Sequence, residues 1–362
     1  MSLDPLLSII PGRGCSANPR NRFEKIELQP DFESLPEEEA LELATGKRTT
    51  EYFDDESQSV ISENDSPDLP FRYSLNPYRG CAHGCSYCYA RPTHEYLGFS
   101  AGLDFETKII VKRQAPELLR RFLSRPAWSV EPIMMSGVTD CYQPGESQFQ
   151  VTRGCLQVAL DFQQPIMLIT KNALILRDVD LIGKLARQNL VSVAISITSL
   201  DQGLTRKLEP RTSSPRARLR AVGELSAAGV PVHAMIAPII LGLNDSEIPA
   251  ILEASAAAGA VSAGYVILRL PLGVAAQFEQ WLAQHAPDQQ RKILGRVRQV
   301  RDGRLNRSEF HERMKGTGVL AQQLAQSFKV FKRRYGLDTK SEPLDCSRFR
   351  IADRSGQLRL FE

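Results

Sequence analysis

The sequence predicts an α/β fold: an incomplete (β/α)6 TIM-like barrel with an acidic N-terminal arm and a helical, basic C-terminal segment. Six short apolar segments alternate with helical patterns from residue 71 onward, as in βα units. Charge is divided unevenly, because residues 1–70 hold sixteen acidic and six basic side chains whereas residues 288–362 hold nine acidic and eighteen basic ones. We therefore expect an N-terminal extension over 1–70, partly irregular, a partial barrel over 71–273, and a helical segment with a tail over 274–362.

The expected strands are short and mostly apolar, as strands buried on both faces are. They are residues 71–75, 132–136, 165–170, 191–198, 230–238 and 261–268. Residues 108–112 also resemble a strand but do not fit this series, so they are expected as an accessory strand. The expected helices are residues 150–162, 177–189, 215–228, 246–258, 275–285, 289–301 and 319–335. Asp245 is a plausible N-cap for the helix over 246–258, and Gly259 is expected to end it.

Length and composition place the chain among ordinary globular proteins, with 362 residues and 42% hydrophobic content. No stretch approaches the roughly 18 consecutive apolar residues of a membrane span, and Asp4 and Pro5 stand where a secretory signal needs positive charge. We expect a cytoplasmic protein with no membrane partner. The seven cysteines are an odd number, and three of them fall within eight residues, so a metal or catalytic use is favoured over disulfides.

These three cysteines, Cys81, Cys85 and Cys88, directly follow the first expected strand, at the end where parallel-sheet proteins place their chemistry. Gly80 and Gly84 allow the loop to curl tightly. Thiolates at its first, fifth and eighth positions can wrap one face of a 4Fe-4S cubane, and three thiolates leave the fourth iron without a protein ligand. The expected cofactor is therefore one 4Fe-4S cluster with an open iron.

The alternative is a closed zinc site, in which His83, His94 or Cys141 completes the three cysteines. The chain would then be a zinc-stabilised binding protein without catalysis. Zinc sites usually combine a CxxC with a second pair of ligands, and no second close pair of cysteines is present in the sequence. This favours the iron-sulfur interpretation.

With these residues in view, the chain resembles the radical S-adenosylmethionine (SAM) superfamily, in the branch related to spore photoproduct lyase and often labelled DNA repair photolyase-like. The resemblance covers about residues 74–270 and rests on NPYRGCAHGCSYCYARPTHEY, SGVTDCYQPGE, ITKN, ISITSLD, EPR and APII. Within that branch the chain is most similar to an uncharacterised subgroup that shares the acidic N-terminal arm and the RPTHEY stretch. The resemblance implies an enzyme that cleaves SAM reductively to a 5′-deoxyadenosyl radical, which abstracts hydrogen from substrate.

The resemblance also implies where SAM binds. Gly137 and Thr139, after the second strand, match the family's site for the amino group, and Lys171, after the third, matches a lysine that meets the carboxylate. A solvated strand-end lysine is the alternative for Lys171.

Three further residues are also expected to contact the cofactor or the substrate. Ser196 alternates with apolar neighbours, so its hydroxyl should point into the barrel within reach of the ribose, unless it is a satisfied core serine. Pro238 is expected to pack against adenine. Arg211 is expected at the SAM carboxylate or at the substrate, with a surface ion pair as the alternative.

The catalytic candidates are Tyr87, Tyr89 and Cys141. Tyr87 and Tyr89 match tyrosines through which spore photoproduct lyases return hydrogen, and Tyr87 also offers backbone contact to adenine. The family's donor cysteine is replaced here by Gly137, and Cys141 stands four residues later. Cys141 is therefore either a displaced hydrogen donor or a small buried thiol. This departure argues against simple photoproduct repair.

The expected partners are a low-potential electron donor, such as flavodoxin or ferredoxin, and a substrate for which nucleic acid, in repair or modification, is the first candidate class. The basic C-terminal segment, with Phe328, Phe331 and Tyr335 interleaved, would suit a polyanion. The favoured alternative is an amphipathic helix whose aromatic side chains pack on the barrel. A protein, peptide or small metabolite is the second substrate class.

Overall fold

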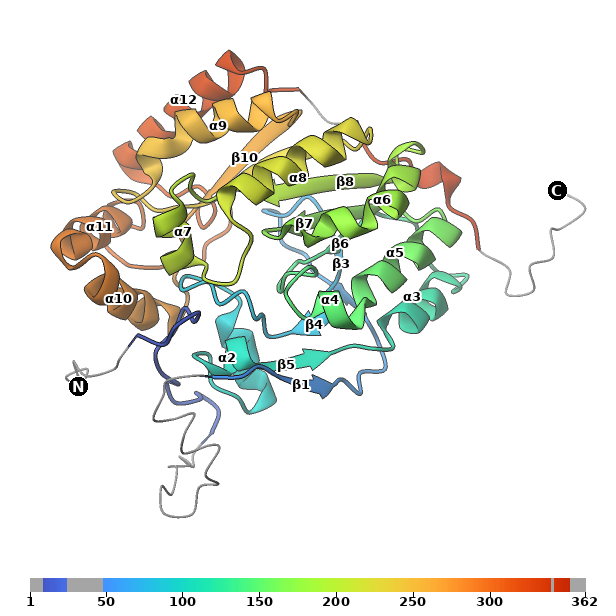
Figure 1. Cartoon of the computed structure of the whole chain (residues 1–362), viewed down its shortest axis with the longest axis horizontal. Coiled ribbons are helices and arrows are strands. Elements are labelled where there is room, and N and C mark those ends of the chain that lie inside the picture. The colour runs from blue at the N-terminus through green and yellow to red at the C-terminus, as the bar shows by residue number, and fades with distance from the viewer. Residues whose placement is uncertain (1–8, 25–47, 340–341, 352–362) are drawn as a thin grey trace, which may run out of the picture.

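The main element of the computed structural model, which describes residues 9–24, 48–339 and 342–351, is a seven-stranded sheet (Figure 1). In spatial order its strands are β10 (Ser262–Ile267), β9 (Val232–Ile239), β8 (Val191–Ser196), β7 (Ile166–Thr170), β6 (Ile133–Met135), β3 (Tyr73–Leu75) and β2 (Ile61–Glu63). The strands from β3 to β10 in this sheet pair in parallel, and β2 adds an antiparallel edge to β3.

The six parallel strands are the six that the apolar segments predict, so the α/β fold with an incomplete barrel is confirmed. Within the described ranges β10 and β2 are not paired with each other, and the sheet stays open between them. Because parallel strands share one direction, their carboxyl ends meet at one rim, and the loops after β3, β6, β7, β8, β9 and β10 lie there together.

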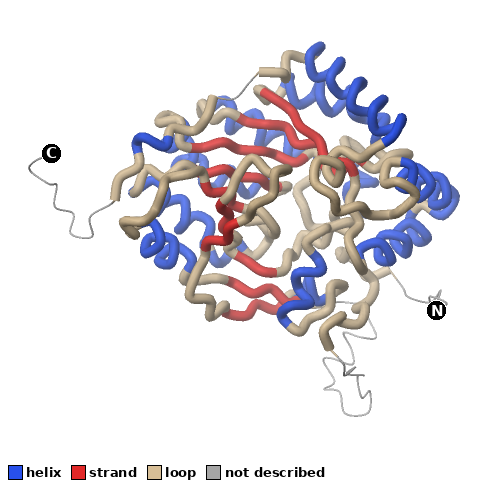
Figure 2. The backbone as a smooth tube through the Cα atoms, turned by 180° about the vertical axis from the view of Figure 1, so that it is seen from behind, coloured by secondary structure: helices blue, strands red, loops and turns tan. Residues whose placement is uncertain are grey.

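A small second sheet has the order β1 (Glu51–Asp54), β5 (Lys108–Val111), β4 (Tyr78–Arg79). Figure 2 shows its strands as a group separate from the large sheet. The accessory strand expected at 108–112 is its central strand, parallel to β1 and antiparallel to β4. Strands β1 and β2 both come from the N-terminal extension, so the part of that extension after residue 48 is built into the two sheets.

The helices that were expected between strands are present with small shifts at their ends, and two of the expected segments, 177–189 and 246–258, begin in a 3-10 turn before the α-helix starts. The longer ones are α3 (Ala115–Leu123), α5 (Val151–Asp161), α6 (Val179–Ala186), α8 (Pro215–Ala227), α9 (Ile248–Ala257), α10 (Val274–His285), α11 (Pro287–Gln299) and α12 (Gly318–Arg334). The short ones are α2 (Asp104–Thr107), α4 (Glu146–Phe149), α7 (Gln202–Leu208) and the 3-10 turns η1 (Arg91–Leu97), η2 (Ala173–Asp178), η3 (Asp245–Glu247) and η4 (Cys346–Arg348).

Two local expectations about helix ends meet different outcomes. Asp245 does not cap α9: it begins the turn η3, and its Oδ1 accepts a hydrogen bond from the Gly242 backbone N–H at 2.7 Å. The Asp245 carboxylate stabilises the preceding tight turn, where Gly242 has φ +91°. It therefore does not accept a hydrogen bond from the first turn of α9. Gly259 does follow the end of α9, with φ +97°, a value that glycine adopts without strain.

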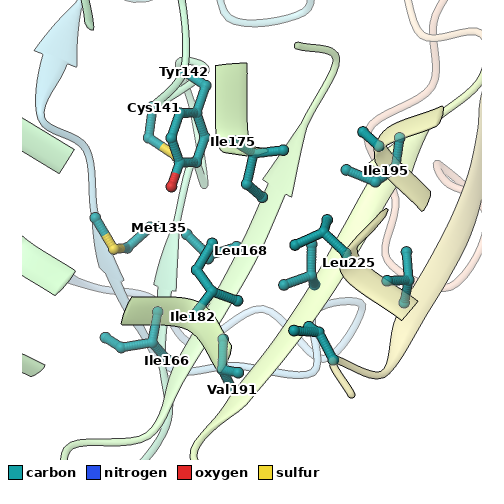
Figure 3. Close-up of a cluster of buried hydrophobic side chains, with 14 of the residues drawn as sticks. Met135, Cys141, Tyr142, Ile166, Leu168, Ile175, Ile182, Val191, Ile195 and Leu225 are labelled. Carbon is teal, nitrogen blue, oxygen red and sulfur yellow. The ribbon is translucent and has the colours of Figure 1, made fainter. Parts of the chain in front are cut away.

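The core lies between the sheet and its outer helices. Successive residues of a strand point to opposite faces of the sheet, so every second residue faces this core. In β7, Ile166, Leu168 and Thr170 are buried, whereas Met167 and Ile169 are half-buried. Figure 3 shows part of the buried layer, with Met135, Cys141, Tyr142, Ile166, Leu168, Ile175, Ile182, Val191, Ile195 and Leu225 labelled. The half-buried set faces the barrel interior, which is thus less tightly filled than the outer layer.

The C-terminal segment covers the otherwise open edge of β10. The Ile267 backbone N–H donates to Met314 O at 2.9 Å, and the Ala263 N–H donates to Leu337 O at 3.3 Å. The fully buried Arg301 donates to the carbonyls of Ile267 (3.0 Å) and Leu268 (2.7 Å). Covering an edge in this way removes a row of unpaired backbone groups from solvent.

Helix α12 packs its aromatic side chains on the barrel, as the favoured interpretation of the basic segment expects. Phe328 is 4% exposed, and its ring centroid lies 4.6 Å from that of Tyr265 on β10. Phe331 and Tyr335 pack against the same core. The exposed face of α12 carries Lys329 and, nearby, other basic residues without the interleaved aromatics that a base-stacking surface needs.

The loop after β2 reaches the segment beside β10 and so joins the two ends of the open sheet. Asp68 is almost fully buried and accepts hydrogen bonds from the His311 backbone N–H at 2.6 Å and from Arg313 Nε at 2.5 Å. Arg313 also donates to Ser66 Oγ. None of the helices in the described ranges has the length and apolar character needed to cross a lipid bilayer.

Candidate functional site

The three-cysteine loop follows β3 at the carboxyl-end rim of the sheet. Gly80 and Gly84 have φ +75° and +67°, so the tight curl expected from them is present. A Cβ on Gly84 would lie 2.6 Å from Glu106 Oε2, which makes the close approach possible only for glycine. The loop is therefore bent and closely packed on its outer side.

Distant segments hold the loop through its backbone. The Cys81 N–H donates to Phe105 O at 2.8 Å, and the Ser86 N–H donates to Leu208 O at 2.9 Å. Gln143 bridges the loop's start, since its Oε1 accepts from the Ala82 N–H (2.9 Å) and its Nε2 donates to the Gly80 carbonyl (3.1 Å). These bonds position the cysteines before any cofactor binds.

A buried ion pair that sequence reasoning missed supports the middle of the loop. Arg91 and Glu106 are both fully buried and paired at 2.5 Å, and Arg91 also donates to the Cys85 carbonyl from Nε (3.1 Å) and Nη2 (2.8 Å). Arg91 lies in the RPTHEY stretch, which gives no sign of the partner carboxylate fifteen residues later in the sequence. Its role is to position the Cys85 backbone.

The thiols of Cys81, Cys85 and Cys88 are all free, and Cys81 and Cys85 are buried. Burial raises the pKa of Cys85 well above its usual range, and Glu209 and the neighbouring thiols raise it further, whereas Lys171 acts in the opposite direction. Burial likewise raises the pKa of Cys88. Such thiols stay protonated in the absence of metal, and a bound metal ionises them.

The donor set fits a cluster better than a single metal ion. Among the described residues, no three His, Cys, Asp or Glu side chains converge on one ion position. A cubane needs no such point, because each thiolate binds a different iron. The Ser86 hydroxyl, fully buried between two of the cysteines, also has no hydrogen-bond partner in the described part of the chain, which suits a neighbouring group that accepts hydrogen bonds.

Two of the three candidate fourth ligands of a zinc site, His83 and Cys141, are engaged elsewhere, and the third, His94, packs among aromatic rings although its ring nitrogens have no hydrogen-bond partner in the described part of the chain. The His94 ring stacks on Phe99 at 5.2 Å, and burial lowers its pKa to about 4. His83 lies 3.4 Å from Asp140, measured from Nδ1 to Oδ2, and 3.2 Å from Asn172 Nδ2. Cys141 belongs to the outer hydrophobic core. The closed zinc alternative therefore lacks support from the geometry.

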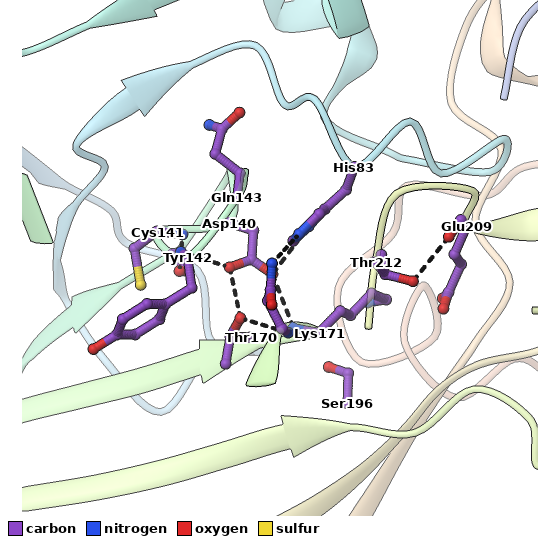
Figure 4. A network of polar contacts seen from close by, with 12 residues as sticks. His83, Asp140, Cys141, Tyr142, Gln143, Thr170, Lys171, Ser196, Glu209 and Thr212 are labelled. Carbon is purple, nitrogen blue, oxygen red and sulfur yellow. Dashed lines mark hydrogen bonds and ion pairs between the residues drawn. The ribbon is translucent and has the colours of Figure 1, made fainter. Parts of the chain in front are cut away.

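Asp140 ties the loop after β6 to the end of β7 (Figure 4). Its Oδ1 accepts from Thr170 Oγ1 at 2.7 Å, and its Oδ2 accepts from the Lys171 backbone N–H at 2.9 Å. Burial would raise the pKa of Asp140, but His83 and these hydrogen bonds outweigh it and lower the pKa to about 2. The carboxylate therefore stays charged and fixes the backbone from which the Lys171 side chain extends.

Lys171 and Ser196 reach the site with polar groups that nothing in the described ranges binds. Lys171 continues the interior face of β7, and its ammonium makes no hydrogen bond or ion pair there, although it is close enough to Cys85, Cys88 and Glu209 to shift their pKa values. Ser196 is 1% exposed, and its hydroxyl likewise makes no hydrogen bond. Both groups are available to a bound molecule.

Thr139, Gly137 and Pro238 serve mainly to shape the rim. Thr139 Oγ1 donates to the Tyr78 carbonyl at 2.7 Å, which leaves the hydroxyl oxygen able to accept a hydrogen bond. The Gly137 carbonyl accepts a hydrogen bond from Tyr89 Oη at 2.9 Å. Pro238 is buried, and its carbonyl accepts from Asn244 Nδ2 at 3.1 Å. All three residues lie at the rim, and their expected contacts with SAM stay predictions.

Tyr87 belongs to a buried network with Glu209 and Arg218. Its hydroxyl donates to Glu209 Oε1, which also accepts from Thr198 Oγ1 at 2.6 Å. Arg218 pairs with the other carboxylate oxygen and donates to the Ser196 carbonyl at 3.1 Å. Burial would raise the pKa of Glu209, but Arg218 and Lys171 outweigh it and lower the pKa. The network joins the cysteine loop to β8, and sequence reasoning missed Arg218.

Tyr89 and Cys141 lie in contrasting places. Tyr89 is 45% exposed at the rim, with its hydroxyl on Gly137. Cys141 is fully buried, and Figure 4 shows its thiol directed away from Lys171. The position of Cys141 agrees with the small buried thiol of the two interpretations, because it is a member of the hydrophobic core.

Arg211 approaches the cysteine loop with its backbone only. Its N–H donates to the His83 carbonyl at 3.2 Å, but its guanidinium points to the N-terminal extension and donates to Thr50 Oγ1 at 3.0 Å. The structure thus does not bring the Arg211 side chain to the other candidates. Its direction depends on Thr50, 161 residues earlier, which the local EPR motif could not indicate.

Residues 9–24 form a strap across the outer side of the cysteine loop. The Gly14 N–H donates to Glu106 Oε2 at 3.0 Å, and Arg13 Nη1 donates to the Glu106 carbonyl at 3.0 Å. Glu106 thus binds the strap through one carboxylate oxygen and Arg91 through the other. The strap covers the face of the loop that is turned away from the barrel interior.

A Gly14→Ala substitution is expected to dislodge the strap, because the new Cβ would lie 1.7 Å from the Gly84 carbonyl oxygen. We expect a loss of about 1–3 kcal/mol in the free energy of unfolding, measured by urea denaturation. Gly295→Ala in α11 is the matched control, since its Cβ would meet nothing within 4 Å, and we expect a gain of up to about 1 kcal/mol there. Equal stability of the two variants would show that the strap does not rest on the loop.

Comparison with known proteins bears on what such a site does. Residues 75–254 match the Radical SAM superfamily. An uncharacterised protein of Mycobacterium tuberculosis is 40% identical over 222 residues, which are 61% of this chain and 65% of that protein. One from Methanocaldococcus jannaschii is 31% identical over 176 residues, 49% of this chain and 63% of that protein. The matched region thus spans less than two thirds of either relative.

Among solved structures, a spore photoproduct lyase variant with bound AdoMet and dinucleoside spore photoproduct superposes with a TM-score of 0.58. The match covers 78% of each chain at 16% identity. A second variant of the same enzyme covers 87% of this chain and 84% of that one, with a TM-score of 0.56 and 16% identity. At this identity the likeness establishes the fold.

Proposed function

We propose that this chain, whose residues 75–254 match the Radical SAM superfamily, is an enzyme in which Cys81, Cys85 and Cys88 hold one 4Fe-4S cluster with an iron open to SAM. The catalytic unit would be residues 71–273, with residues 1–70 and 274–362 as extensions. When bound, the cluster and SAM supply a low-potential electron and a 5′-deoxyadenosyl radical that abstracts hydrogen from substrate, leaving methionine.

The observation that carries this proposal is the free ammonium of Lys171 beside the cysteines. A half-buried cation without a hydrogen-bond partner is costly unless a ligand supplies an anion, and the SAM carboxylate is such an anion. The Ser196 hydroxyl lies on the next strand and makes no hydrogen bond in the described ranges, and we propose that it binds the ribose. Together they suit two separate polar groups of one cofactor.

The chain's own residues would orient the cofactor and shield it. Glu209, charged and buried, receives the Tyr87 hydroxyl and so holds the cysteine loop against β8. Asp140 fixes the backbone of Lys171. Buried, fixed groups of this kind limit the paths open to a reactive radical. Reduction requires an external donor, for which flavodoxin or ferredoxin is the candidate.

Tyr89 is the preferred candidate for contact with substrate. It is the catalytic candidate with an exposed side chain, and its hydroxyl touches Gly137, where the related lyases carry a hydrogen-donating cysteine. Cys141, in the outer core, is less well placed to donate hydrogen. A thiol donor at this rim would have to come from another source, so simple photoproduct repair is not what we propose.

Nucleic acid stays the first candidate substrate class, supported by the likeness in fold to a lyase variant that holds a dinucleoside photoproduct. A protein, peptide or metabolite is the alternative, supported by the packing of the α12 aromatics into the core. An electrophoretic shift of DNA or RNA that weakens steeply with salt would favour nucleic acid.

The decisive experiment is anaerobic reconstitution with iron and sulfide, followed by reduction in the presence of SAM. We expect about four irons per chain and release of 5′-deoxyadenosine and methionine, measured by chromatography. One zinc per chain with no cleavage of SAM would overturn the proposal and restore the zinc-stabilised binding protein.

Lys171→Gln is expected to weaken SAM binding about 10- to 100-fold, since a charge-assisted contact contributes roughly 1.5–3 kcal/mol. Equilibrium dialysis with the reconstituted protein measures this directly. Lys184→Gln, at an exposed position on α6, is the control and should bind SAM as the wild type does. If both variants bind equally well, Lys171 is only a solvated strand-end lysine.

A further inference from the structure

Arg269 lies two residues beyond the end of β10, at the same rim as the cysteine loop. Its guanidinium carbon is 5.3 Å from the ring centroid of Tyr89. Tyr89, whose hydroxyl donates to the Gly137 carbonyl, is the residue that we propose to meet the substrate. Arg269 therefore lies beside the proposed substrate position. No motif in the sequence drew attention to it.

The guanidinium of Arg269 is poorly satisfied. Its Nε is buried and has no hydrogen-bond partner in the described part of the chain, and its Nη1 meets only the thioether sulfur of Met314 at 3.6 Å, a weak acceptor. No carboxylate of the described residues lies within ion-pair distance of it. Burial lowers the pKa of Arg269, and Arg313 lowers it further, while Tyr89 and Asp68 act in the opposite direction.

The neighbouring carboxylate cannot serve Arg269. Asp68 is 4% exposed and already accepts from Arg313 Nε at 2.5 Å and from the His311 N–H at 2.6 Å. Those bonds join the two ends of the open sheet, as described above. Asp68 therefore influences Arg269 at a distance without pairing with it.

Other buried arginines of the chain are satisfied in ways that Arg269 is not. Arg91 pairs with Glu106, and Arg218 pairs with Glu209. Arg301 has no carboxylate but directs Nη1 and Nη2 to four backbone carbonyls and is fully buried, so no ligand reaches it. Arg269 is partly exposed, with an open donor edge.

We propose that Arg269 binds an oxyanion of the substrate, a phosphate or a carboxylate, and that the substrate of this site is therefore anionic. Because Nε is buried, the edge that a ligand can reach is the one formed by Nη1 and Nη2, and these two nitrogens form a planar fork that matches two oxygens of either group. The Tyr89 ring holds the guanidinium plane in place, so little side-chain freedom is lost on binding. The assignment rests on the proposed function in one respect, since it takes Tyr89 as the substrate side of the cofactor site.

The test measures binding of two anionic probes to the reconstituted protein with SAM by fluorescence anisotropy. One probe is a labelled single-stranded hexadeoxynucleotide, which offers phosphates, and the other is labelled hexaglutamate, which offers carboxylates. Arg269→Gln removes the charge, Arg269→Lys keeps the charge but removes the fork, and Arg298→Gln removes an exposed arginine of α11 that pairs with Glu279 at 3.7 Å.

Arg269→Gln is expected to weaken one of the two probes about 10- to 100-fold, with Arg269→Lys in between and Arg298→Gln within about twofold of wild type. Loss confined to the oligonucleotide identifies phosphate, and loss confined to hexaglutamate identifies carboxylate. Equal affinity of wild type and Arg269→Gln for both probes overturns the inference, as does failure of the wild type to bind either at low salt.

Failure of the proposed function would look different. If the proposed function is wrong, the wild-type protein releases no 5′-deoxyadenosine. That result does not depend on whether the two probes bind. A melting curve for each variant guards against misfolding, because Arg269→Lys and Arg269→Gln change the same packing and should shift the melting temperature similarly. If Arg269→Lys and Arg269→Gln have similar melting temperatures but different affinities for a probe, the charge at this position contributes to binding. If Arg269→Lys also binds that probe more weakly than the wild type, the planar guanidinium contributes as well.

Discussion

Cys85→Ala is expected to abolish cluster loading and SAM cleavage. Two remaining thiolates cannot hold a cubane that presents a single open iron, and the Cys85 thiol is the buried one that Lys171 and Glu209 both influence. Iron content after anaerobic reconstitution should fall from about four per chain to near background. The production of 5′-deoxyadenosine should fall below detection in the same samples.

Cys155→Ala is the matched control, because it also removes one fully buried thiol. Cys155 lies in α5, inside the outer core, and within the described ranges no hydrogen bond joins its side chain to the cysteine loop. It should load iron and cleave SAM like the wild type, with at most a small loss of stability. Equal iron loss in both variants would remove the basis for assigning Cys81, Cys85 and Cys88 as the ligands.

Arg91→Met is expected to cost about 3–5 kcal/mol in the free energy of unfolding, because it leaves Glu106 buried without its cation. It also releases the Cys85 carbonyl, which accepts two hydrogen bonds from Arg91. We therefore expect poor cluster loading even in the fraction of protein that folds. Urea denaturation and iron analysis measure the two effects separately.

Two further variants make this prediction sharper. Arg220→Met removes an exposed arginine that pairs with Glu224 at 3.4 Å on α8, and it should change stability by no more than about 0.5 kcal/mol. Glu106→Gln keeps the volume of the carboxyl but removes its charge, and it should resemble Arg91→Met in direction. Wild-type iron content in a folded Arg91→Met protein would show that the pair does not position the loop.

Short, regular features of the fold could be predicted because their signals are local. The strands β3 and β6 to β10 are apolar runs bounded by turns, and such a run by itself indicates a buried strand. Strands β1 and β2 escaped prediction because their side chains are mostly exposed, with no apolar alternation to mark them. They exist because β5 and β3 offer them partners, which no local window contains.

The candidate site divides in the same way. Lys171 and Ser196 stand at strand ends, where alternation along β7 and β8 directs them to the interior. Arg211 was expected beside them, but Thr50 draws its guanidinium to the outside. Thr139 was expected to contact SAM, and because its hydroxyl donates to the Tyr78 carbonyl, it can meet a ligand only as an acceptor. The strand determines the backbone position of a residue. The packing around the residue determines where its side chain points and which of its polar atoms have no hydrogen-bond partner.

The sequence by itself determined the parallel sheet and the placing of three cysteines in one loop, because short apolar runs mark buried strands and because eight residues of one loop must stay close together whatever surrounds them. Only the tertiary structure decided how that loop is held, through Arg91 and Glu106, and which arginine stands open at the rim. Arg269 and Tyr89 are 180 residues apart in the chain and meet because β10 and the cysteine loop share one end of the sheet. Contacts between such distant segments depend on the packing of the whole sheet, and no local pattern records them.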